Sequence, residues 1–342
     1  MLLLLGLALA ADPVPSPAPL DAPAAAPLDP SAPTEAPAFG RTVDESIVEA
    51  ITLRQRGDVD GARALLIALE TRVPAESLPT YLYQRGLCEE LDGEPEKARA
   101  FYEQVIALAA SEPASADGGV ALDAHFRRAL VLEELGLHDA ALLEVLALDR
   151  VRGLSAEDEL TVALQRGISE LLTGKRARGI RRIQKSLAAT EGATTHGYLR
   201  AKARYHLARA LLEEADALSL DGAERRVVKR LEGRALRIKA AEQQIIALAA
   251  LQEPEWVLAS LISLGDSYGR LAADLGASPP PKRLDDAQAT IYRAEIAKKV
   301  ENVRTKSFHA YDSGVALATR LAWESGRVAT LKERRDGFAG QR

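Results

Sequence analysis

The sequence predicts an all-α protein, and both its composition and the spacing of its glycines favour this fold class. Hydrophobic residues make up 47% of the 342-residue chain but aromatic residues only 4%, so alanine and leucine supply most of the apolar surface. Both are strong helix formers, whereas the β-branched and aromatic residues that favour strands are scarce. The chain is longer than one average domain and can bury a substantial core.

Four glycines mark an internal repeat in residues 43–193. Each has a small residue seven positions before it, another five positions after it, and a larger apolar residue nine positions after it. The spacing between successive glycines, about 40 residues, suits one helical hairpin per unit. The four sets are Ala50, Gly57, Ala62 and Leu66; Gly86, Gly93, Ala98 and Tyr102; Ala129, Gly136, Ala141 and Val145; and Gly167, Gly174, Gly179 and Ile183.

The residue types at these positions fit the physics of a helical hairpin. The central glycine is expected to end the first helix with a positive φ, a conformation that only glycine adopts cheaply. The two small residues let the paired helices approach closely, and the larger residue fills the space toward the next hairpin. Because one hairpin cannot bury its apolar face alone, neighbours are expected to stack into an α-solenoid.

This pattern of small residue, turn glycine and small residue resembles the tetratricopeptide repeat family. The first three units match best, and Pro74 follows the first unit as the family pattern requires. The family usually has a large apolar residue just before the first small one, where this chain has Glu49, Arg85, Arg128 and Arg166. The resemblance implies a right-handed α-solenoid, and scaffolding and peptide binding rather than a reaction.

The two ends of the chain differ from this repeat region. Residues 1–10 have the apolar run and small residues of a signal peptide without its initial positive charges, which predicts export to the periplasm or cell envelope. Residues 11–42 are rich in proline and alanine and are expected to form a disordered, extended linker, with a proline-rich ligand for a partner domain as the alternative.

Residues 194–342 are expected to continue the array with longer, less regular helices. Part of this region, residues 292–331, is similar to the ends of envelope repeat proteins of gliding bacteria. Its apolar patterns and breakers predict helices over 198–218, 223–251 and 254–275, a long helix from Leu284, and a closing helix through Trp323 to about Arg335.

Two sets of residues are candidates for binding. Apolar residues ten and six positions before each turn glycine either line a concave groove for an extended segment or partner helix, or pack as core between helices. They are Ile47, Ile51, Tyr83, Leu87, Phe126, Leu130, Leu164 and Ile168. Basic residues either form solvated helix faces or dock an anionic surface. They are Lys175, Arg176, Arg178, Arg181 and Arg182 in the fourth unit, and Arg225, Arg226, Lys229, Arg230 and Arg234 beyond it.

No motif in the sequence nominates a catalytic residue, a cofactor or a metal. The one GxSxG string, residues 265–269, falls inside a helical pattern, whereas a nucleophile elbow needs a strand-to-helix turn. The net charge of −5 argues against nucleic acid as a partner. We expect a non-catalytic scaffold or adaptor that binds other proteins of an envelope machine for motility, secretion or outer-membrane assembly. The alternative is a module that binds an anionic cell-wall polymer or membrane surface.

Overall fold

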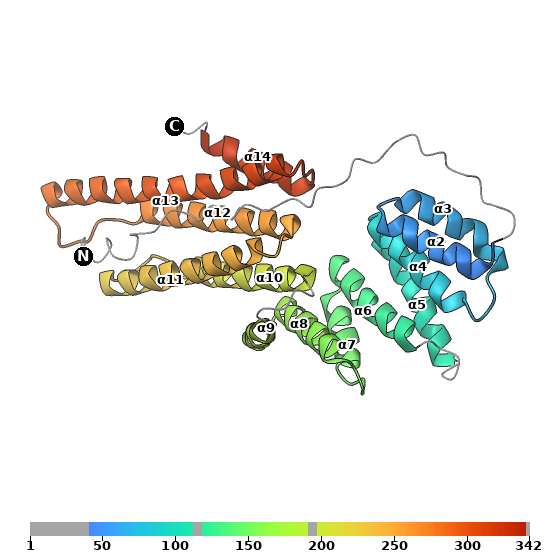
Figure 1. The fold of residues 1–342 in the computed structure, drawn as a ribbon. Helices are drawn as coiled ribbons and strands as arrows, with labels where there is room; N and C mark the ends of the chain where they lie inside the picture. The colour runs from blue at the N-terminus through green and yellow to red at the C-terminus, as the bar shows by residue number, and fades with distance from the viewer. Residues whose placement is uncertain (1–40, 112–117, 191–196, 340–342) are drawn as a thin grey trace. The chain divides into compact units, whose positions relative to one another are not determined.

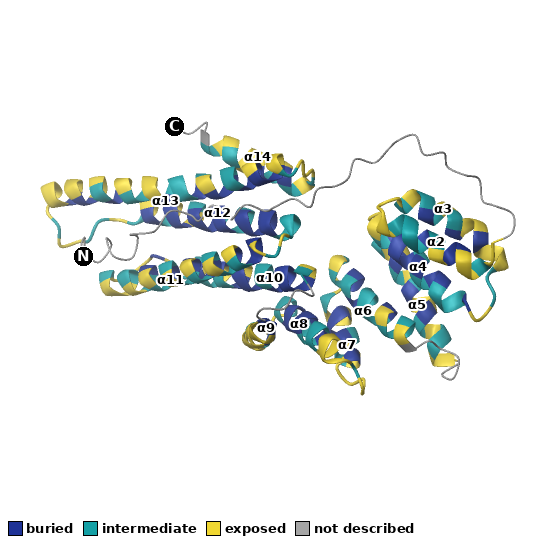
Figure 2. Cartoon of the chain, in the orientation of Figure 1, coloured by how far each residue is buried: buried dark blue, intermediate teal, exposed yellow. Residues whose placement is uncertain are grey.

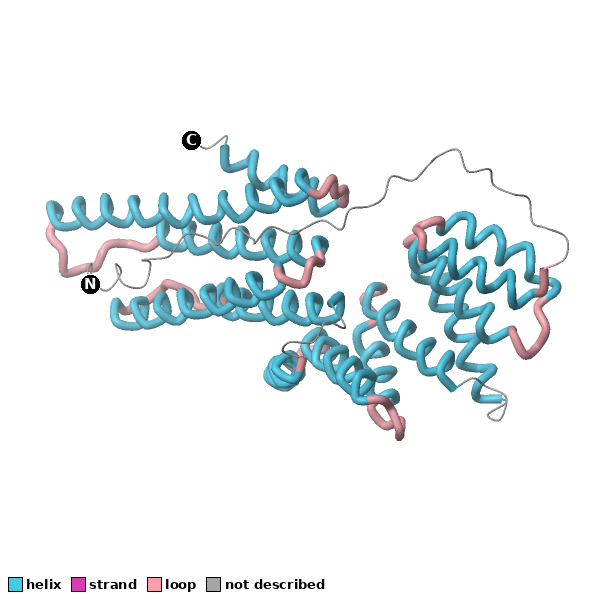
Figure 3. Tube along the Cα trace, in the orientation of Figure 1, coloured by secondary structure: helices cyan, strands magenta, loops and turns pink. Residues whose placement is uncertain are grey.

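A computed structural model describes residues 41–111, 118–190 and 197–339, and every regular element in these ranges is a helix (Figures 1 and 3). The predicted all-α class is therefore confirmed. Described residues up to Ser186 form one compact unit and those from Leu187 onward form another. The expected signal peptide and nearly all of the expected linker lie outside the described residues.

The N-terminal unit consists of successive hairpins in which each helix packs against its neighbours along the chain. It begins with a capping box in which the Thr42 hydroxyl accepts from the Glu45 N–H and the Glu45 carboxylate accepts from the Thr42 N–H. Its helices are α2 (Val43–Gln55), α3 (Val59–Leu69), the short 3-10 helix η1 (Glu70–Arg72), α4 (Leu78–Leu91), α5 (Pro95–Ser111), α6 (Gly118–Glu134), α7 (His138–Leu148), α8 (Ala156–Leu172) and α9 (Arg176–Ala189).

The turn glycines of the repeat adopt the predicted conformation. Their φ angles are +89° at Gly57, +75° at Gly93, +74° at Gly136 and +78° at Gly174. At each turn the N–H after the glycine reaches back to the carbonyl five residues earlier, at 2.8 to 3.0 Å. This bond satisfies a carbonyl that the helix end would leave without a partner, and it fixes where each first helix stops.

The small residues of each hairpin allow the close approach that the spacing predicts. A Cβ placed on Gly86 would lie 2.6 Å from the Tyr102 ring, and one on Gly167 would lie 2.8 Å from the Ile183 side chain. The alanines and the larger apolar residues of the repeat are buried. At Gly86 and Gly167 a methyl group would therefore collide with the facing side chain, and glycine is required there.

The C-terminal unit is built from longer helices around α12, which contacts the other four (Figure 1). Buried residues follow α12 for most of its length (Figure 2). Trp323, expected inside the closing helix, lies instead in the turn before it. The helices are α10 (Gly197–Asp216), α11 (Glu224–Ala249), α12 (Pro254–Ala277), α13 (Asp286–Arg320) and α14 (Gly326–Ala339). None of the described helices has an apolar stretch long enough to cross a bilayer.

Candidate interaction surfaces

The eight apolar residues predicted on the first helices divide into two groups. Ile47, Leu87, Leu164 and Ile168 are buried. These four are core, and the groove interpretation is wrong for them because a buried side chain offers no surface to a ligand. The other four are half-buried: Ile51 and Tyr83 pack against the core of the first two hairpins, Phe126 packs against the next cluster, and Leu130 lies on the same helix as Phe126.

A row of polar contacts joins neighbouring first helices of the N-terminal unit. In each contact, the residue four positions after the small residue of one first helix meets the residue two positions before the small residue of the next. The pairs are Arg54 with Gln84 at 3.3 Å, Glu90 with Arg127 at 3.1 Å, and Glu133 with Gln165 at 2.6 Å. Sequence reasoning missed this row, although a polar side chain recurs at nearly all of these positions.

The middle contact of this row belongs to a larger polar cluster formed by residues of α4, α5 and α6. The Glu90 carboxylate accepts from the Tyr102 hydroxyl at 2.8 Å and from the Arg127 guanidinium. Burial, with Glu90 adding to it, raises the pKa of Tyr102 well above its usual range, and burial also raises the pKa of Tyr83 beside Arg127. The half-buried Tyr83 phenol, which its raised pKa keeps neutral, and the half-exposed Arg127 guanidinium thus lie together at the junction of two hairpins.

The charged residues that depart from the repeat pattern have structural partners. Arg85 lies over the Phe101 ring, 4.8 Å from its centroid, and donates to the Tyr81 hydroxyl at 3.0 Å. These positions are therefore used for polar or cation–π contacts in place of apolar packing. In the other units Glu49 pairs with Arg41, Arg128 pairs with Glu144, and Arg166 pairs with Asp149 and Glu170.

The basic cluster on α9 is largely at the surface. Lys175, Arg178 and Arg181 are exposed, and residues 175–189 contain no aspartate or glutamate. Arg176 is half-buried, and Arg182 donates to the buried Glu170 carboxylate at 3.1 Å, which ties it to α8. The exposed basic surface at α9 is therefore formed chiefly by Lys175, Arg178 and Arg181, and not by all five predicted residues.

The second basic cluster begins at the exposed first turn of α11. Arg225, Arg226 and Lys229 are exposed there. Arg230 instead donates to the backbone carbonyls of Ser219 at 3.2 Å and Asp221 at 3.1 Å, closing the loop before α11.

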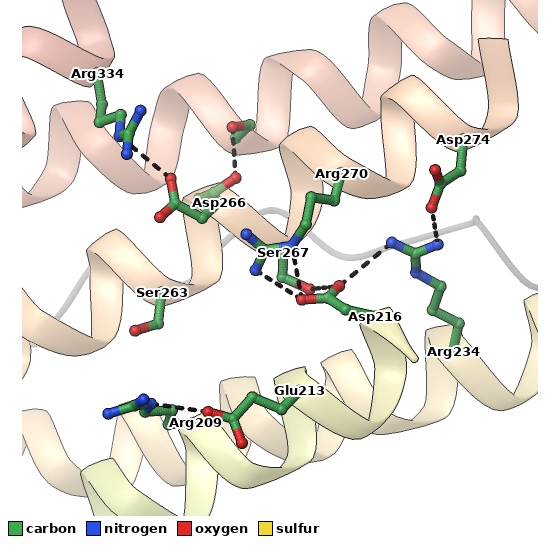
Figure 4. A network of polar contacts seen from close by, with 12 residues as sticks. Arg209, Glu213, Asp216, Arg234, Ser263, Asp266, Ser267, Arg270, Asp274 and Arg334 are labelled. Atoms are coloured by element: carbon green, nitrogen blue, oxygen red, sulfur yellow. Dashed lines mark hydrogen bonds and ion pairs between the residues drawn. The ribbon is translucent and has the colours of Figure 1, made fainter. Parts of the chain in front are cut away.

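Arg234, predicted on this basic surface, is 0% exposed, and the prediction is wrong at this residue. Its guanidinium lies between Asp216 of α10 and Asp274 of α12 (Figure 4). Asp216 also accepts from Ser267 and Arg270, both at 2.8 Å. A buried guanidinium is tolerated because carboxylates compensate its charge. Arg234 therefore joins three helices and contributes no surface.

The GxSxG string lies inside α12, as its helical context predicts. Gly265 sits directly beneath the Tyr311 ring, whose hydroxyl donates to Asp266 at 2.7 Å. Ser267 donates to Asp216, so its hydroxyl is used in the buried network (Figure 4). The string thus packs α12 against α13 and α10.

Within the described ranges, no group of three or more His, Cys, Asp and Glu residues could hold a metal ion. No protein-family model matches the chain, and no curated protein matches it significantly.

Proposed function

We propose that the chain is a non-catalytic scaffold of the cell envelope, exported to the periplasm, whose tetratricopeptide-like hairpins bind partner proteins of a motility, secretion or outer-membrane assembly machine. The observation that carries this proposal is the row of first helices α2, α4, α6 and α8, linked at the same positions from one hairpin to the next. Aligned helices of stacked hairpins form an extended surface of the kind that repeat proteins use for binding.

The cluster of Tyr83, Glu90 and Arg127 is the centre of this proposed surface. Tyrosine and arginine are enriched where binding energy concentrates in protein interfaces. The Arg127 guanidinium is already held by Glu90, so a partner carboxylate would meet a donor whose side-chain entropy has in part been lost. We therefore expect the partner to contribute an acidic residue near α6.

The test places a photo-crosslinking amino acid at Leu130, one turn beyond Arg127, in the native cell. We expect it to capture defined envelope proteins and to lose them when Arg127→Ala is introduced. Arg99→Ala on α5 is the matched control and should leave capture unchanged. A crosslinker at the exposed Leu143 of α7 should capture none of these proteins. Equal capture from Leu130 and Leu143 would contradict a specific surface on the first helices.

Export is tested separately by mass spectrometry of the native protein. The Leu2–Ala10 run motivates cleavage after Ala10 and residence beyond the inner membrane. An intact N-terminus on a cytoplasmic protein would leave a cytosolic adaptor as the better proposal.

A second candidate function is binding of an anionic cell-wall polymer or membrane surface, and the exposed bases of α9 favour it. Such binding should weaken steeply with ionic strength, because exposed charges are screened. Reversing Arg178 and Arg181 to Glu should abolish it, while capture through Leu130 should persist. Capture that is insensitive to salt and to the charge reversal would exclude this candidate.

A further inference from the structure

Both tryptophans of the chain lie in one aromatic patch on the C-terminal unit. The Trp256 ring at the start of α12 has its centroid 5.7 Å from that of Tyr198 and 5.2 Å from that of Tyr205, both on α10. Trp323 joins the patch through its indole N–H, which donates to Glu255 at 3.2 Å. Tyr198, Tyr205, Trp256 and Trp323 together form this aromatic patch.

The patch is partly open to solvent and has an unused hydrogen-bond donor. Tyr198 is 52% exposed and Trp323 is 39% exposed. The buried indole N–H of Trp256 has no hydrogen-bond partner among the described residues. Buried donors are nearly always bonded, so this one calls for an acceptor. Aromatic side chains are few in this chain, and their concentration at one surface points to a ligand.

The chemistry of the patch fits an extended proline-rich peptide. Proline rings pack on aromatic faces, and the polyproline II helix has no internal hydrogen bonds, so its carbonyls are free to accept from an indole N–H. Arg327, whose guanidinium lies 5.4 Å from the Trp256 centroid, covers one edge of this ring and is held there by Glu255, which compensates its charge.

The chain itself supplies such a peptide in the region before residue 41. Residues 11–39 contain nine prolines, four acidic residues and no lysine or arginine. Pro27, Pro30 and Pro33 recur every third residue, which places them on one edge of a polyproline II helix with three residues per turn. At 3.1 Å per residue, the 29 residues of this region can span about 90 Å.

We propose that residues 27–33 dock on the aromatic patch of the same chain, with Pro27, Pro30 and Pro33 against the aromatic rings. The Trp256 indole then donates to a peptide carbonyl. Docking ties the proline-rich region to the C-terminal unit and shields both tryptophans from solvent.

The first test uses tryptophan fluorescence of the full chain, since both fluorophores lie in the patch. In the triple variant Pro27→Ala, Pro30→Ala and Pro33→Ala, we expect a rise in acrylamide quenching and a red shift of the emission. The matched control replaces Pro15, Pro17 and Pro19 by Ala and should change neither. Equal quenching in the native chain and both variants would overturn the proposal. Far-UV circular dichroism checks that the helices are unchanged.

The second test locates the docked region with a photo-crosslinker at Ser31 of the full chain, mixed with an isotopically labelled copy. We expect crosslinks to residues of the aromatic patch within one chain, and their loss in Tyr198→Ala. The control Leu236→Ala removes an exposed leucine of α11 and should leave the crosslinks intact. Crosslinks to the patch of the other copy, to the basic face of α9, or to no part of the chain would each overturn docking within one chain.

Discussion

The two units differ in the length of their helices and in the turns that join them, but both bring their helices into close contact. In the N-terminal unit, helices of 11 to 17 residues are joined by glycine turns with positive φ. In the C-terminal unit, helices of 20 to 35 residues precede the last helix, and two turns use Gln252 and Ala322 at positive φ in place of glycine. Yet both units contain a glycine that lies against a tyrosine ring of the neighbouring helix, Gly86 against Tyr102 and Gly265 against Tyr311. The two units thus share a close glycine–tyrosine contact although their helices differ in length and in the turns that join them.

Charged residues distinguish the units more sharply. In the N-terminal unit, the polar row links each first helix to the next, so each contact spans two neighbouring hairpins. In the C-terminal unit, Arg234 joins α10, α11 and α12 at one buried point (Figure 4). We expect the C-terminal unit to unfold as one cooperative body, whereas the hairpins depend chiefly on their neighbours.

The largest expected effect follows from removing the buried guanidinium. Arg234→Met removes the cation that Asp216 and Asp274 share and should lower the free energy of unfolding by about 3 kcal/mol. This is the low end for a broken buried ion pair, because Asp274 is half exposed and Asp216 keeps its contact with Arg270. Urea denaturation, followed by tryptophan fluorescence, reports on the C-terminal unit because both tryptophans lie there. Arg270→Met removes an exposed partner of Asp216 and should cost about 1 kcal/mol or less. Similar losses for both variants would contradict a special role for the buried arginine.

The next effect tests whether the two glycine–tyrosine contacts are equivalent. Gly86→Ala and Gly265→Ala each force a methyl group against a tyrosine ring and should destabilise their own unit by about 1–3 kcal/mol. Thermal unfolding monitored by circular dichroism measures both. Gly337→Ala in α14 has no heavy atom within 4 Å of the added Cβ, and it should be neutral or slightly stabilising. A large loss of stability at only one of the two tyrosine contacts would show that the contacts are not equivalent in the two units.

A smaller effect is expected at the turns of the hairpins. Gly136 has a φ of +74°, so Gly136→Val should cost about 1 kcal/mol or somewhat more, through backbone strain alone, since its Cβ meets no neighbour. Gly136→Asn should cost less because asparagine tolerates this region. The melting temperature of the N-terminal unit measures both, and an unchanged value for the valine variant would refute the turn assignment.

The smallest effect is a dependence on pH that arises from Glu144 in the N-terminal unit. Burial alone would raise the pKa of Glu144, but hydrogen bonds from His125 and Arg128 outweigh burial and lower it below its usual 4.5. A carboxyl with a lowered folded-state pKa stabilises above its unfolded pKa, and this contribution is lost as pH falls through the folded value. Stability should thus decline below about pH 4.5, and Glu144→Gln should flatten the decline in acid denaturation.

Local sequence signals were sufficient to predict the turns and the buried residues of the hairpins. The positive φ of the four turn glycines and the burial of residues such as Ala98 and Tyr102 follow from spacing alone, because each hairpin is closed by contacts near in sequence. The start of α12 at Pro254 was predicted for the same local reason. The end of the chain was predicted less well: Trp323 fits a helical pattern, but its place in a turn depends on how α14 packs on α12.

Burial of charge could not be predicted from local patterns. Arg234 belongs to a run of bases that resembles a solvated face, and its partners Asp216 and Asp274 lie on other helices. The apolar residues Leu164 and Ile168 were ambiguous for a similar reason, because groove and core have the same periodicity. The aromatic patch was missed since its members lie on three separate segments, and only the folded unit brings Tyr198, Trp256 and Trp323 together.

The stacking of hairpins along the N-terminal unit also determines how that unit would respond to tension. A pull along the chain would load the hairpins in series, and each could open at the cost of its contacts with the next. Such a unit would lengthen in steps as single hairpins unfold, and the hairpins would refold when the load is released. The C-terminal unit, with α12 held by four helices, would resist as one block. The N-terminal unit would then extend under load while the C-terminal unit stays folded. Pulling a single molecule in optical tweezers would resolve this difference as several small unfolding events and one large one.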